Sequence, residues 1–294
     1  MALCCMLHLT ALAQIDSLRI HRYLEGKRAV VGMALLCDEA VFTYGNQERY
    51  PLMSVFKFHV AVAALQKMEE ERIDIDRVVP VDTRSFDSET YSPLYKKFPN
   101  CCVRLSYREL ITYTVSLSDN NTCDLLIDFV GGTDQVDARI RSLGISHFGL
   151  AVNEKRMHQD QRNCSQNWST PLAMASLLRK VFEEPVLSEA HTSFLLQILL
   201  DSPTGATKLK AGLPAGVSLA HKTGQSGRTS DGKQIADNDA GILFFPSGRK
   251  AFLVVFVKDS YETNEANAAL IAGIARMVSE SMGETASCSL RKEE

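Results

Sequence analysis

The stretch YPLMSVFK (Tyr50–Lys57) joins an extended tetrapeptide to an apolar run with helical character, Val55–Met68. Its S-x-x-K spacing would place Lys57 one helical turn after Ser54, over the same face. A serine at a helix start gains N–H donors and a favourable dipole for developing negative charge. A desolvated lysine beside it can accept the hydroxyl proton. An N-cap serine followed by a surface lysine explains the pattern equally well, so it predicts nothing alone.

Two further motifs follow along the chain. Ser118-Asp119-Asn120 lies between two helix-like runs, 107–114 and 123–130, where its side chains can point from a loop into a cleft. The ordinary alternative is a helix cap. Lys222-Thr223-Gly224 ends a strand-like run, and a glycine at a strand edge lets a ligand approach the backbone closely. Three motifs in this order are far less expected by chance than any one of them.

Hydrophobic periodicity and turn residues predict an α+β fold. The order is one helix, two strands, many helices, three strands and a final helix. We expect a five-stranded, mainly antiparallel sheet flanked by helices, together with an all-helical lobe inserted between its strands. The expected strands are Ala29–Leu36, Ala40–Tyr44, Val217–Thr223, Ala240–Phe245 and Ala251–Lys258. The expected helices are 15–25, Val55–Met68, Tyr107–Thr114, Cys123–Val130, Gln135–Leu143, Pro171–Phe182, Ser188–Leu200 and Asn264–Met282.

The same patterns give a domain division. Residues 14–48 and 201–283 form the α/β lobe, and residues 49–200 form the helical lobe, with an irregular active-site loop at 151–169. Residues 284–294 are a polar tail. Residues 1–13 are apolar and end in Ala11-Leu12-Ala13, which resembles a secretory signal without its basic start. A frayed apolar terminus is the alternative to this signal.

Composition narrows the functional classes. A chain of 294 residues with a net charge of −3 gives no reason to expect a nucleic-acid partner. No apolar run approaches the roughly 20 residues of a membrane helix. The histidines and cysteines show neither H-E-x-x-H nor paired C-x-x-C spacing, so we expect no metal and no cofactor. We expect a monomer that acts on a small molecule.

The set S-x-x-K, S-D-N and K-T-G resembles class A serine β-lactamases and penicillin-binding proteins. Tyr91-Ser92-Pro93 and Leu213–Gly216 resemble further segments of the β-lactamases. Cys123–Leu126, Met157-His158 and Val257–Ser260 are most similar to the PER and CfxA-like branch. The resemblance implies the β-lactamase/transpeptidase-like fold, a β-lactam substrate and a bacterial protein that is periplasmic or secreted.

The resemblance also implies residue roles. Ser54 is the acylated nucleophile, with its own N–H and that of Gln225 as the oxyanion hole. Either Lys57 or Glu154 serves as the base for acylation, and Glu154 activates water for deacylation. The implied catalytic residues are Ser54, Lys57, Ser118, Glu154 and Lys222. The implied substrate-binding residues are Tyr91, Asn120, His158, Lys208, Thr223, Gly224, Gln225 and Ser226.

Some positions depart from the family pattern. Ala151-Val152 stands where an arginine is usual and Asn167 where an aspartate is usual, so the ion pair that normally pins the loop is missing. Asp124 replaces a common asparagine. His158 occupies a usual asparagine position and is expected to help position water. Lys208 replaces an arginine that contacts the substrate carboxylate, and it keeps the charge without the bidentate fork.

Three functions compete. A penicillin-binding transpeptidase or carboxypeptidase would share Ser54, Lys57, Ser118 and Lys222 but lack a base for deacylation. A non-hydrolytic β-lactam sensor would normally be attached to membrane helices. Glu154 in the long loop favours a β-lactamase, because general-base help is worth about 10²–10⁴ in rate. By analogy, the loop suggests a roomy site and extended-spectrum activity on penicillins and cephalosporins.

Overall fold

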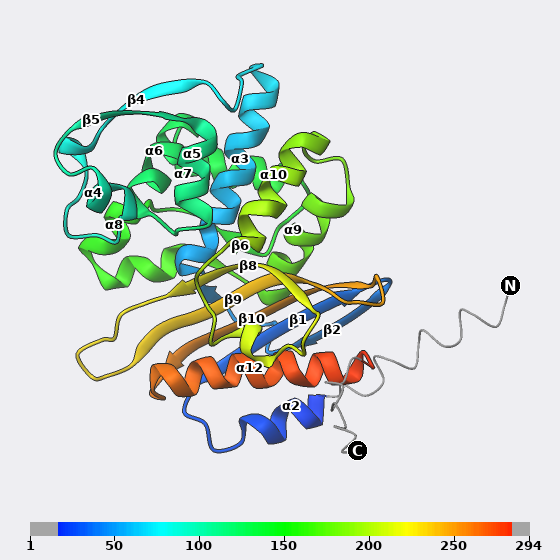
Figure 1. Ribbon diagram of the computed structural model, residues 1–294. Coiled ribbons are helices and arrows are strands. Elements are labelled where there is room, and N and C mark those ends of the chain that lie inside the picture. The colour runs from blue at the N-terminus through cyan, green and yellow to red at the C-terminus, as the bar shows by residue number, and fades with distance from the viewer. Residues whose placement is uncertain (1–16, 284–294) are drawn as a thin grey trace, which may run out of the picture.

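The computed structural model describes residues 17–283, so the predicted signal segment and polar tail lie outside the described residues. At its centre is one five-stranded sheet in the order β2-β1-β10-β9-β8. Every neighbouring pair is antiparallel, which confirms the predicted sheet (Figure 1). The strands are β1 (Val30–Cys37), β2 (Ala40–Tyr44), β8 (Ser218–Gln225), β9 (Gln234–Phe244) and β10 (Lys250–Ser260).

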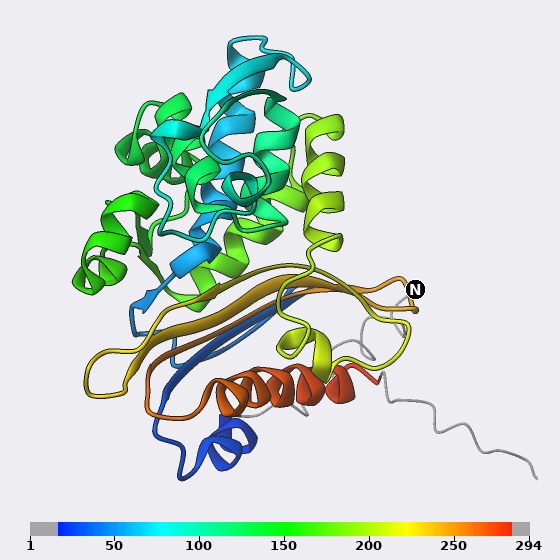
Figure 2. The ribbon, with the colours of Figure 1, turned by 60° about the vertical axis from the view of Figure 1, so that its left-hand side comes forward.

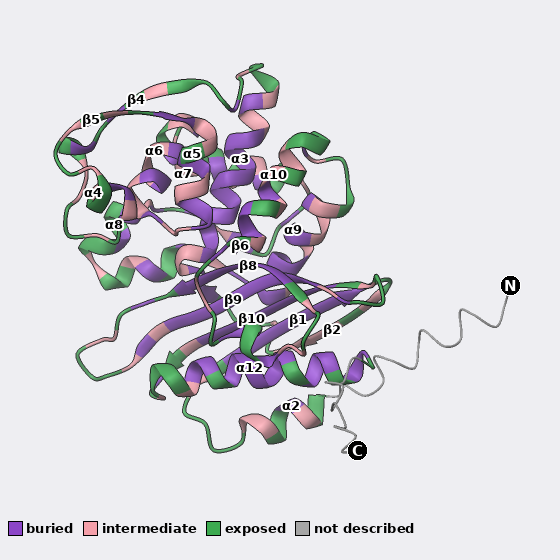
Figure 3. Ribbon diagram, viewed as in Figure 1, coloured by how far each residue is buried: buried purple, intermediate pink, exposed green. Residues whose placement is uncertain are grey.

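Helices cover both faces of this sheet, and the side chains of its central strands alternate between two hydrophobic cores. On β1, Met33 and Leu35 join the core on one face, whereas Ala34 and Leu36 join the core on the other. Burial on both faces explains why β1 is a nearly continuous apolar run rather than an alternating one. Figure 3 shows this buried layer between the two helical layers.

One face of the sheet carries helices from the two ends of the described chain, α2 and α12, together with the short α11 (Figure 1). Their bounds are α2 (Ser17–Leu24), α11 (Leu209–Gly212) and α12 (Asn264–Ser281). Thr263 caps α12 by accepting a hydrogen bond from Ala266 N. Ile271, Ile274 and Val278 of α12 are completely buried in the core beneath the sheet.

The opposite face carries the larger helical region (Figure 2). Helix α3 runs through its centre and is buried over most of its length. The bounds are α3 (Lys57–Glu70), α4 (Pro93–Lys97), α5 (Tyr107–Val115), α6 (Asn120–Val130), α7 (Thr133–Ser142), α9 (Pro171–Glu183) and α10 (Glu189–Leu200). Local sequence explains two of these helix ends: Ser106 and Glu109 form a capping box at the start of α5, and Gly131 ends α6 in the left-handed conformation.

Several short strands were not predicted, because three of them have only two residues each and the other two bury only one or two of their five residues. A three-stranded sheet joins β3 (Tyr50–Pro51), β7 (Trp168–Ser169) and β6 (Phe148–Gly149), and a separate pair joins β4 (Val78–Asp82) and β5 (Cys102–Ser106). Strand β9 begins at Gln234 rather than Ala240. The polar triplet Asp237–Asp239 hid its first half, although all three residues are buried.

The prediction of an irregular loop over 151–169 is wrong. The segment contains α8 (Glu154–Gln159), the 3₁₀ helix η4 (Gln161–Gln166) and β7. Asn153 caps α8 by accepting from Arg156 N, and Asp160 caps η4 by accepting from Arg162 N. Both turns are too short for hydrophobic periodicity, so only their caps marked them in the sequence. Within residues 17–283, no helix is both long and apolar enough to cross a membrane.

Candidate active site

Ser54 lies in the 3₁₀ turn η2 (Met53–Phe56), which leads directly into α3. The preceding Met53 has a φ of 47°, in the left-handed region that non-glycine residues rarely adopt. Such strain persists only where the surrounding structure holds the backbone firmly, and it is concentrated at functional sites. The turn therefore holds Ser54 in a defined position at the entrance of a buried helix.

Strand β8 runs directly alongside this turn. A Cβ atom on Gly224 would lie 2.5 Å from Leu52 O and 3.0 Å from Ser54 N. Only a glycine permits that approach, which gives the third residue of the K-T-G motif a steric reason. From the next strand, Asn238 Nδ2 donates to Leu52 O at 3.1 Å. The Ser54 turn is thus fastened to the edge of the sheet, next to Gln225.

Lys57 lies at the centre of the site, and its side chain is completely buried. Its Nζ lies 3.0 Å from Ser54 Oγ and 2.8 Å from Glu154 Oε1. It also contacts Ser118 O at 2.8 Å and Asn120 Oδ1 at 2.5 Å. An ammonium has only three protons to donate, so these four acceptors compete for them. The arrangement suits a group that exchanges a proton with Ser54 or Glu154.

Ser118 adopts a φ of 60°, which makes it a second left-handed, non-glycine residue at the site. Its Oγ lies 2.9 Å from Lys222 Nζ and 3.5 Å from Lys57 Nζ. Lys222 is buried, and burial foremost, followed by the charge of Lys57, lowers its pKa well below the ordinary value. Ser118 is therefore placed between two amines, as a hydroxyl that relays a proton would be.

The middle residue of the S-D-N motif, Asp119, is structural and completely buried. Its Oδ2 accepts from Ser92 Oγ and from Leu94 N, each at 2.8 Å. Asn120 N donates to Tyr91 O at 3.0 Å, which holds Tyr91 at the rim of the site. The Tyr91 side chain is 52% exposed, so it is available to a ligand.

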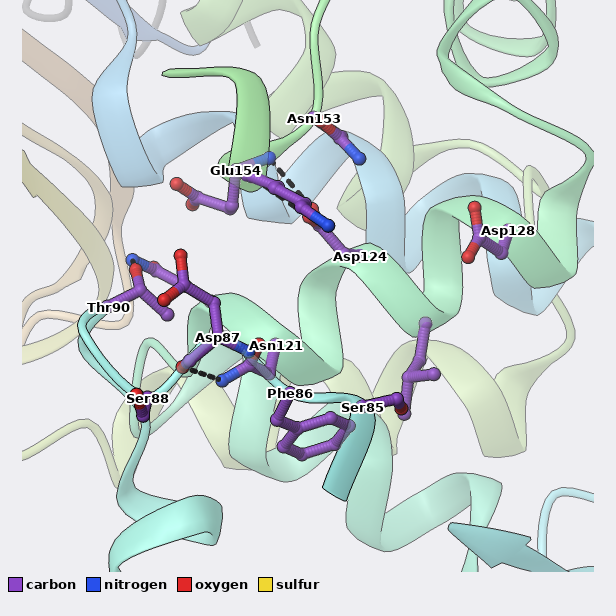
Figure 4. A pocket seen from close by; sticks show the side chains of 13 residues that line it. Ser85, Phe86, Asp87, Ser88, Thr90, Asn121, Asp124, Asp128, Asn153 and Glu154 are labelled. Atoms are coloured by element: carbon purple, nitrogen blue, oxygen red, sulfur yellow. Dashed lines mark hydrogen bonds between the residues drawn. The ribbon is translucent and has the colours of Figure 1, made fainter. Parts of the chain in front are cut away.

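Glu154 begins α8 and is buried, with its carboxylate directed at Lys57. Asp124, on α6, accepts from Glu154 N at 2.7 Å and from Lys155 N at 3.0 Å (Figure 4). Burial is the main reason that the pKa of Asp124 is raised to about 7. The Asp124 carboxylate thus holds the backbone of Glu154 and Lys155 in place. The sequence did not reveal this role.

Asn167 joins the two ends of the segment 151–169, where the sequence lacks the residues for an ion pair. Its Oδ1 accepts from Ala151 N at 2.8 Å and Val152 N at 3.1 Å, and its Nδ2 donates to Val152 O at 2.7 Å. Its own carbonyl accepts from Leu52 N at 2.8 Å, two residues before Ser54. The loop is therefore pinned by neutral hydrogen bonds and tied to the nucleophile turn.

Comparison with known proteins agrees with this geometry. The family model described as the beta-lactamase enzyme family matches residues 13–282. The chain belongs to this β-lactamase family. It is 45% identical to a β-lactamase of Bacteroides uniformis over 266 residues, which covers 90% of each chain. It is 36% identical to the extended-spectrum β-lactamase PER-1 of Pseudomonas aeruginosa, covering 90% of this chain and 84% of PER-1.

Solved structures give the same result for the fold. A class A β-lactamase from Bacteroides cellulosilyticus DSM 14838 superposes with a TM-score of 0.90 at 43% identity, covering 94% of this chain and 99% of that one. The TLA-3 extended-spectrum β-lactamase superposes with a TM-score of 0.87 at 39% identity, covering 89% and 96%. The chain thus has the class A β-lactamase fold, as its motifs implied.

The β-lactamase fold brings most, but not all, of the expected residues together. Thr223 Oγ1 lies 3.0 Å from Thr204 Oγ1, and Ser226 Oγ donates to Gly227 O at 2.7 Å. His158 is exposed on α8, outside the buried cluster around Lys57. Lys208 Nζ lies 2.5 Å from Asp237 Oδ1, so this lysine already has a carboxylate partner within the chain.

A cavity of about 570 Å³ extends beyond the Glu154 loop, between that loop and the segment 85–90 (Figure 4). Thr90, Asn120 and Glu154 are among the residues that line it. Asn121 holds the segment 85–90 in place, because its Oδ1 accepts from Asp87 N and its Nδ2 donates to Asp87 O, both at 3.0 Å. Asn121 follows the S-D-N motif directly, and that position was the only sequence signal for it.

Within residues 17–283, no cluster of three or more His, Cys, Asp or Glu side chains is arranged to hold a metal ion.

Proposed function

We propose that the chain hydrolyses the β-lactam amide of penicillins and cephalosporins through an acyl-enzyme on Ser54. One observation carries the proposal: Lys57 Nζ lies 3.0 Å from Ser54 Oγ and 2.8 Å from Glu154 Oε1. A nucleophile and a carboxylate base share one buried amine. β-Lactam hydrolysis is the activity of the family to which the chain belongs.

Acylation begins when Ser54 Oγ attacks the lactam carbonyl and loses its proton to Lys57, or to Glu154. The N–H groups of Ser54 and Gln225 stabilise the oxyanion, and Gly224 keeps β8 close enough for both to reach it. The C–N bond breaks as Ser118 Oγ delivers a proton to the ring nitrogen and takes one in turn from Lys57, whose Nζ lies 3.5 Å away. Lys222 Nζ, 2.9 Å from Ser118 Oγ, supports that transfer.

Deacylation separates this proposal from a penicillin-binding protein. Glu154 takes a proton from water, and the resulting hydroxide attacks the acyl carbonyl. Ser54 Oγ then leaves the tetrahedral intermediate and regains a proton through Lys57. General-base help of this kind is worth about 10²–10⁴ in rate, enough to decide between turnover and a trapped acyl-enzyme. Burial of Glu154 beside Lys57 supports its role as this base.

Substrate recognition uses the two sides of the cleft. Lys222, Thr223 and Ser226 face the substrate carboxylate, and Asn120 holds the side-chain amide with Tyr91 at the rim. The cavity of about 570 Å³ beyond Glu154 offers room for bulky cephalosporin side chains. The relatives PER-1 and TLA-3 are themselves named extended-spectrum enzymes. We extend that substrate range to this chain.

All proposed catalytic groups come from one chain, which supports a monomer. We also propose two lobes, an α/β lobe of residues 14–48 and 201–283 and a helical lobe of residues 49–200, with the cleft between them. Export to the periplasm or the medium of a bacterium follows from the apolar start of the sequence.

The test is steady-state turnover of a chromogenic cephalosporin by the purified protein, with Ser54→Ala as the inactive control. We expect continuous hydrolysis far beyond one equivalent of enzyme. A stoichiometric burst followed by no further reaction would instead identify a penicillin-binding protein. Binding without any acylation would identify a sensor.

A further inference from the structure

Lys208 and Asp237 form a buried ion pair beside the K-T-G strand. Their charged atoms, Nζ and Oδ1, lie 2.5 Å apart, and the side chains are only 8% and 1% exposed. The Lys208 Nζ also donates to Asn238 O at 3.3 Å. Neither this pair nor the negative charge of Asp237 takes part in the proposed acylation and deacylation steps.

The pair lies next to the proposed substrate-carboxylate site. Asp237 is the register partner of Gln225 on β8. Thr223 and Gln225 lie two residues apart on the strand, so both face the same side of the sheet as Asp237. Lys208, Gln225 and Asp237 together line a cavity of about 450 Å³ under this edge. Lys208 therefore lies at the same edge of the sheet as Thr223 and Gln225 of the proposed carboxylate site.

The neighbouring carboxylate cannot replace Asp237 as a partner. Asp239 Oδ1 lies 2.8 Å from His221 Nδ1, and its Oδ2 accepts from Leu209 N at 3.2 Å. Lys208 is close enough for its charge to contribute to the lowered pKa of Lys222, after burial and Lys57. Asp237 thus neutralises a cation that would otherwise add to the positive potential facing an anionic substrate.

We propose that Asp237 competes with the substrate carboxylate for Lys208, and so acts as a positioning residue that weakens the binding of anionic substrates. The inference rests on the proposed β-lactam-hydrolysing function and adds a residue that sets its affinity. An ammonium has three donors, and Asp237 and Asn238 O engage two of them. A substrate carboxylate that reaches Lys208 must share the cation with Asp237 and accept the repulsion of a second negative charge.

The test measures binding separately from turnover. In a Ser54→Gly background, dissociation constants for benzylpenicillin and its methyl ester are determined by calorimetry with and without Asp237→Asn. We expect the variant to bind the acid about tenfold more tightly, the effect of one charge-assisted hydrogen bond. The ester, which has no carboxylate charge, should bind equally to both proteins.

Two matched variants make the assignment specific. Adding Lys208→Gln to Asp237→Asn should abolish the gain, and Asp237→Glu, which keeps the charge, should leave the dissociation constants unchanged. With Ser54 intact, Asp237→Asn should lower KM for penicillin and change kcat little. A merely structural role would not produce this split or distinguish acid from ester.

Clear outcomes overturn the inference. Equal shifts for acid and ester, or a gain that survives Lys208→Gln, would show that Asp237 does not act through Lys208. If Asp237→Asn fails to fold, Lys208→Arg takes its place. A guanidinium can hold both carboxylates at once, so tighter binding of the acid alone is expected and unchanged binding contradicts the proposal. Failure of wild-type turnover, with the acid–ester difference intact, would reject only the hydrolytic function.

Discussion

The two walls of the cleft are built from different interactions. The Ser54 wall consists of η2, the start of α3 and β8, and it is held by close packing: Lys57 is completely buried, and Gly224 leaves no room for a Cβ atom against η2. The Glu154 wall is the segment 151–169, and it is held by side-chain hydrogen bonds from Asn167 and Asp124.

This difference shows where the site is sensitive. Closely packed interiors have low compressibility, so the Ser54 wall has no room for an added atom. The Glu154 wall depends on a few polar contacts, and segments of this kind open more readily than a packed core. We therefore expect changes in the Ser54 wall to act on positioning and changes in the Glu154 wall to act on stability and on deacylation.

Among variants of Gly224, Asn167 and Asp124, Gly224→Ala should have the largest effect. Its Cβ would lie 2.5 Å from Leu52 O, so β8 must move away from the Ser54 turn. A displacement of about 1 Å at a catalytic centre costs about 10²-fold in rate. The measurement is kcat/KM with a chromogenic cephalosporin. Gly227→Ala is the matched control, since the nearest atom to its Cβ is Gln161 Nε2 at 3.9 Å.

Near-normal activity of Gly224→Ala would mean that the close contact between the two elements is not needed for the reaction.

Asn167→Ala tests the Glu154 wall. The variant removes hydrogen bonds to Ala151 N, Val152 N and Val152 O, and it leaves buried backbone groups without partners. At about 1 kcal/mol for each bond, the free energy of unfolding should fall by about 3 kcal/mol. Urea denaturation measures this loss. Deacylation should slow by about tenfold, on the scale of about 1.4 kcal/mol for each factor of ten.

Ser165→Ala is the matched control, because Ser165 lies in the same segment and is exposed. Its stability should stay within about 0.5 kcal/mol of the wild type. An Asn167→Ala protein as stable as this control would show that the loop is held by something else.

Asp124 should make stability depend on pH, with the smallest effect. Its pKa rises from 3.8 to about 7, chiefly through burial. Between these values the folded chain binds more protons than the unfolded chain, so the free energy of unfolding falls as pH rises. Asp124→Asn removes this titration. Between about pH 5 and 7, its free energy of unfolding should therefore fall by about 2 kcal/mol less than that of the wild type. Asp128→Asn, exposed on the same helix, should keep the wild-type slope.

Parallel pH curves for the wild type and Asp124→Asn would contradict a half-buried, titrating carboxylate beneath Glu154.

The Ser54 wall was largely predictable because its residues belong to short motifs on regular elements. Ser54 and Lys57 are three positions apart at a helix start, and helical geometry alone brings them together. The five-stranded sheet followed from hydrophobic periodicity. Strand β9 was predicted too short, because periodicity could not show that Asp237–Asp239 find partners from other elements.

The Glu154 wall was less predictable, because its contacts join distant positions. Asn167 binds Ala151 across 16 positions, and Asp124 binds Glu154 N across 30. An asparagine in place of an aspartate indicated a missing ion pair, but not the neutral hydrogen bonds that replace it. The Lys208–Asp237 pair was hidden for the same reason, since its members lie on different elements.

The most direct test of the central claim is the fate of Ser54 in a Glu154→Gln variant. Intact mass spectrometry follows the protein after mixing with benzylpenicillin. If Glu154 activates the deacylating water, one acyl group should accumulate on Ser54 and steady turnover should fall by about 10²–10⁴-fold. Turnover at the wild-type rate with no acylated species would show that Glu154 is not the base and that the two walls do not cooperate as proposed.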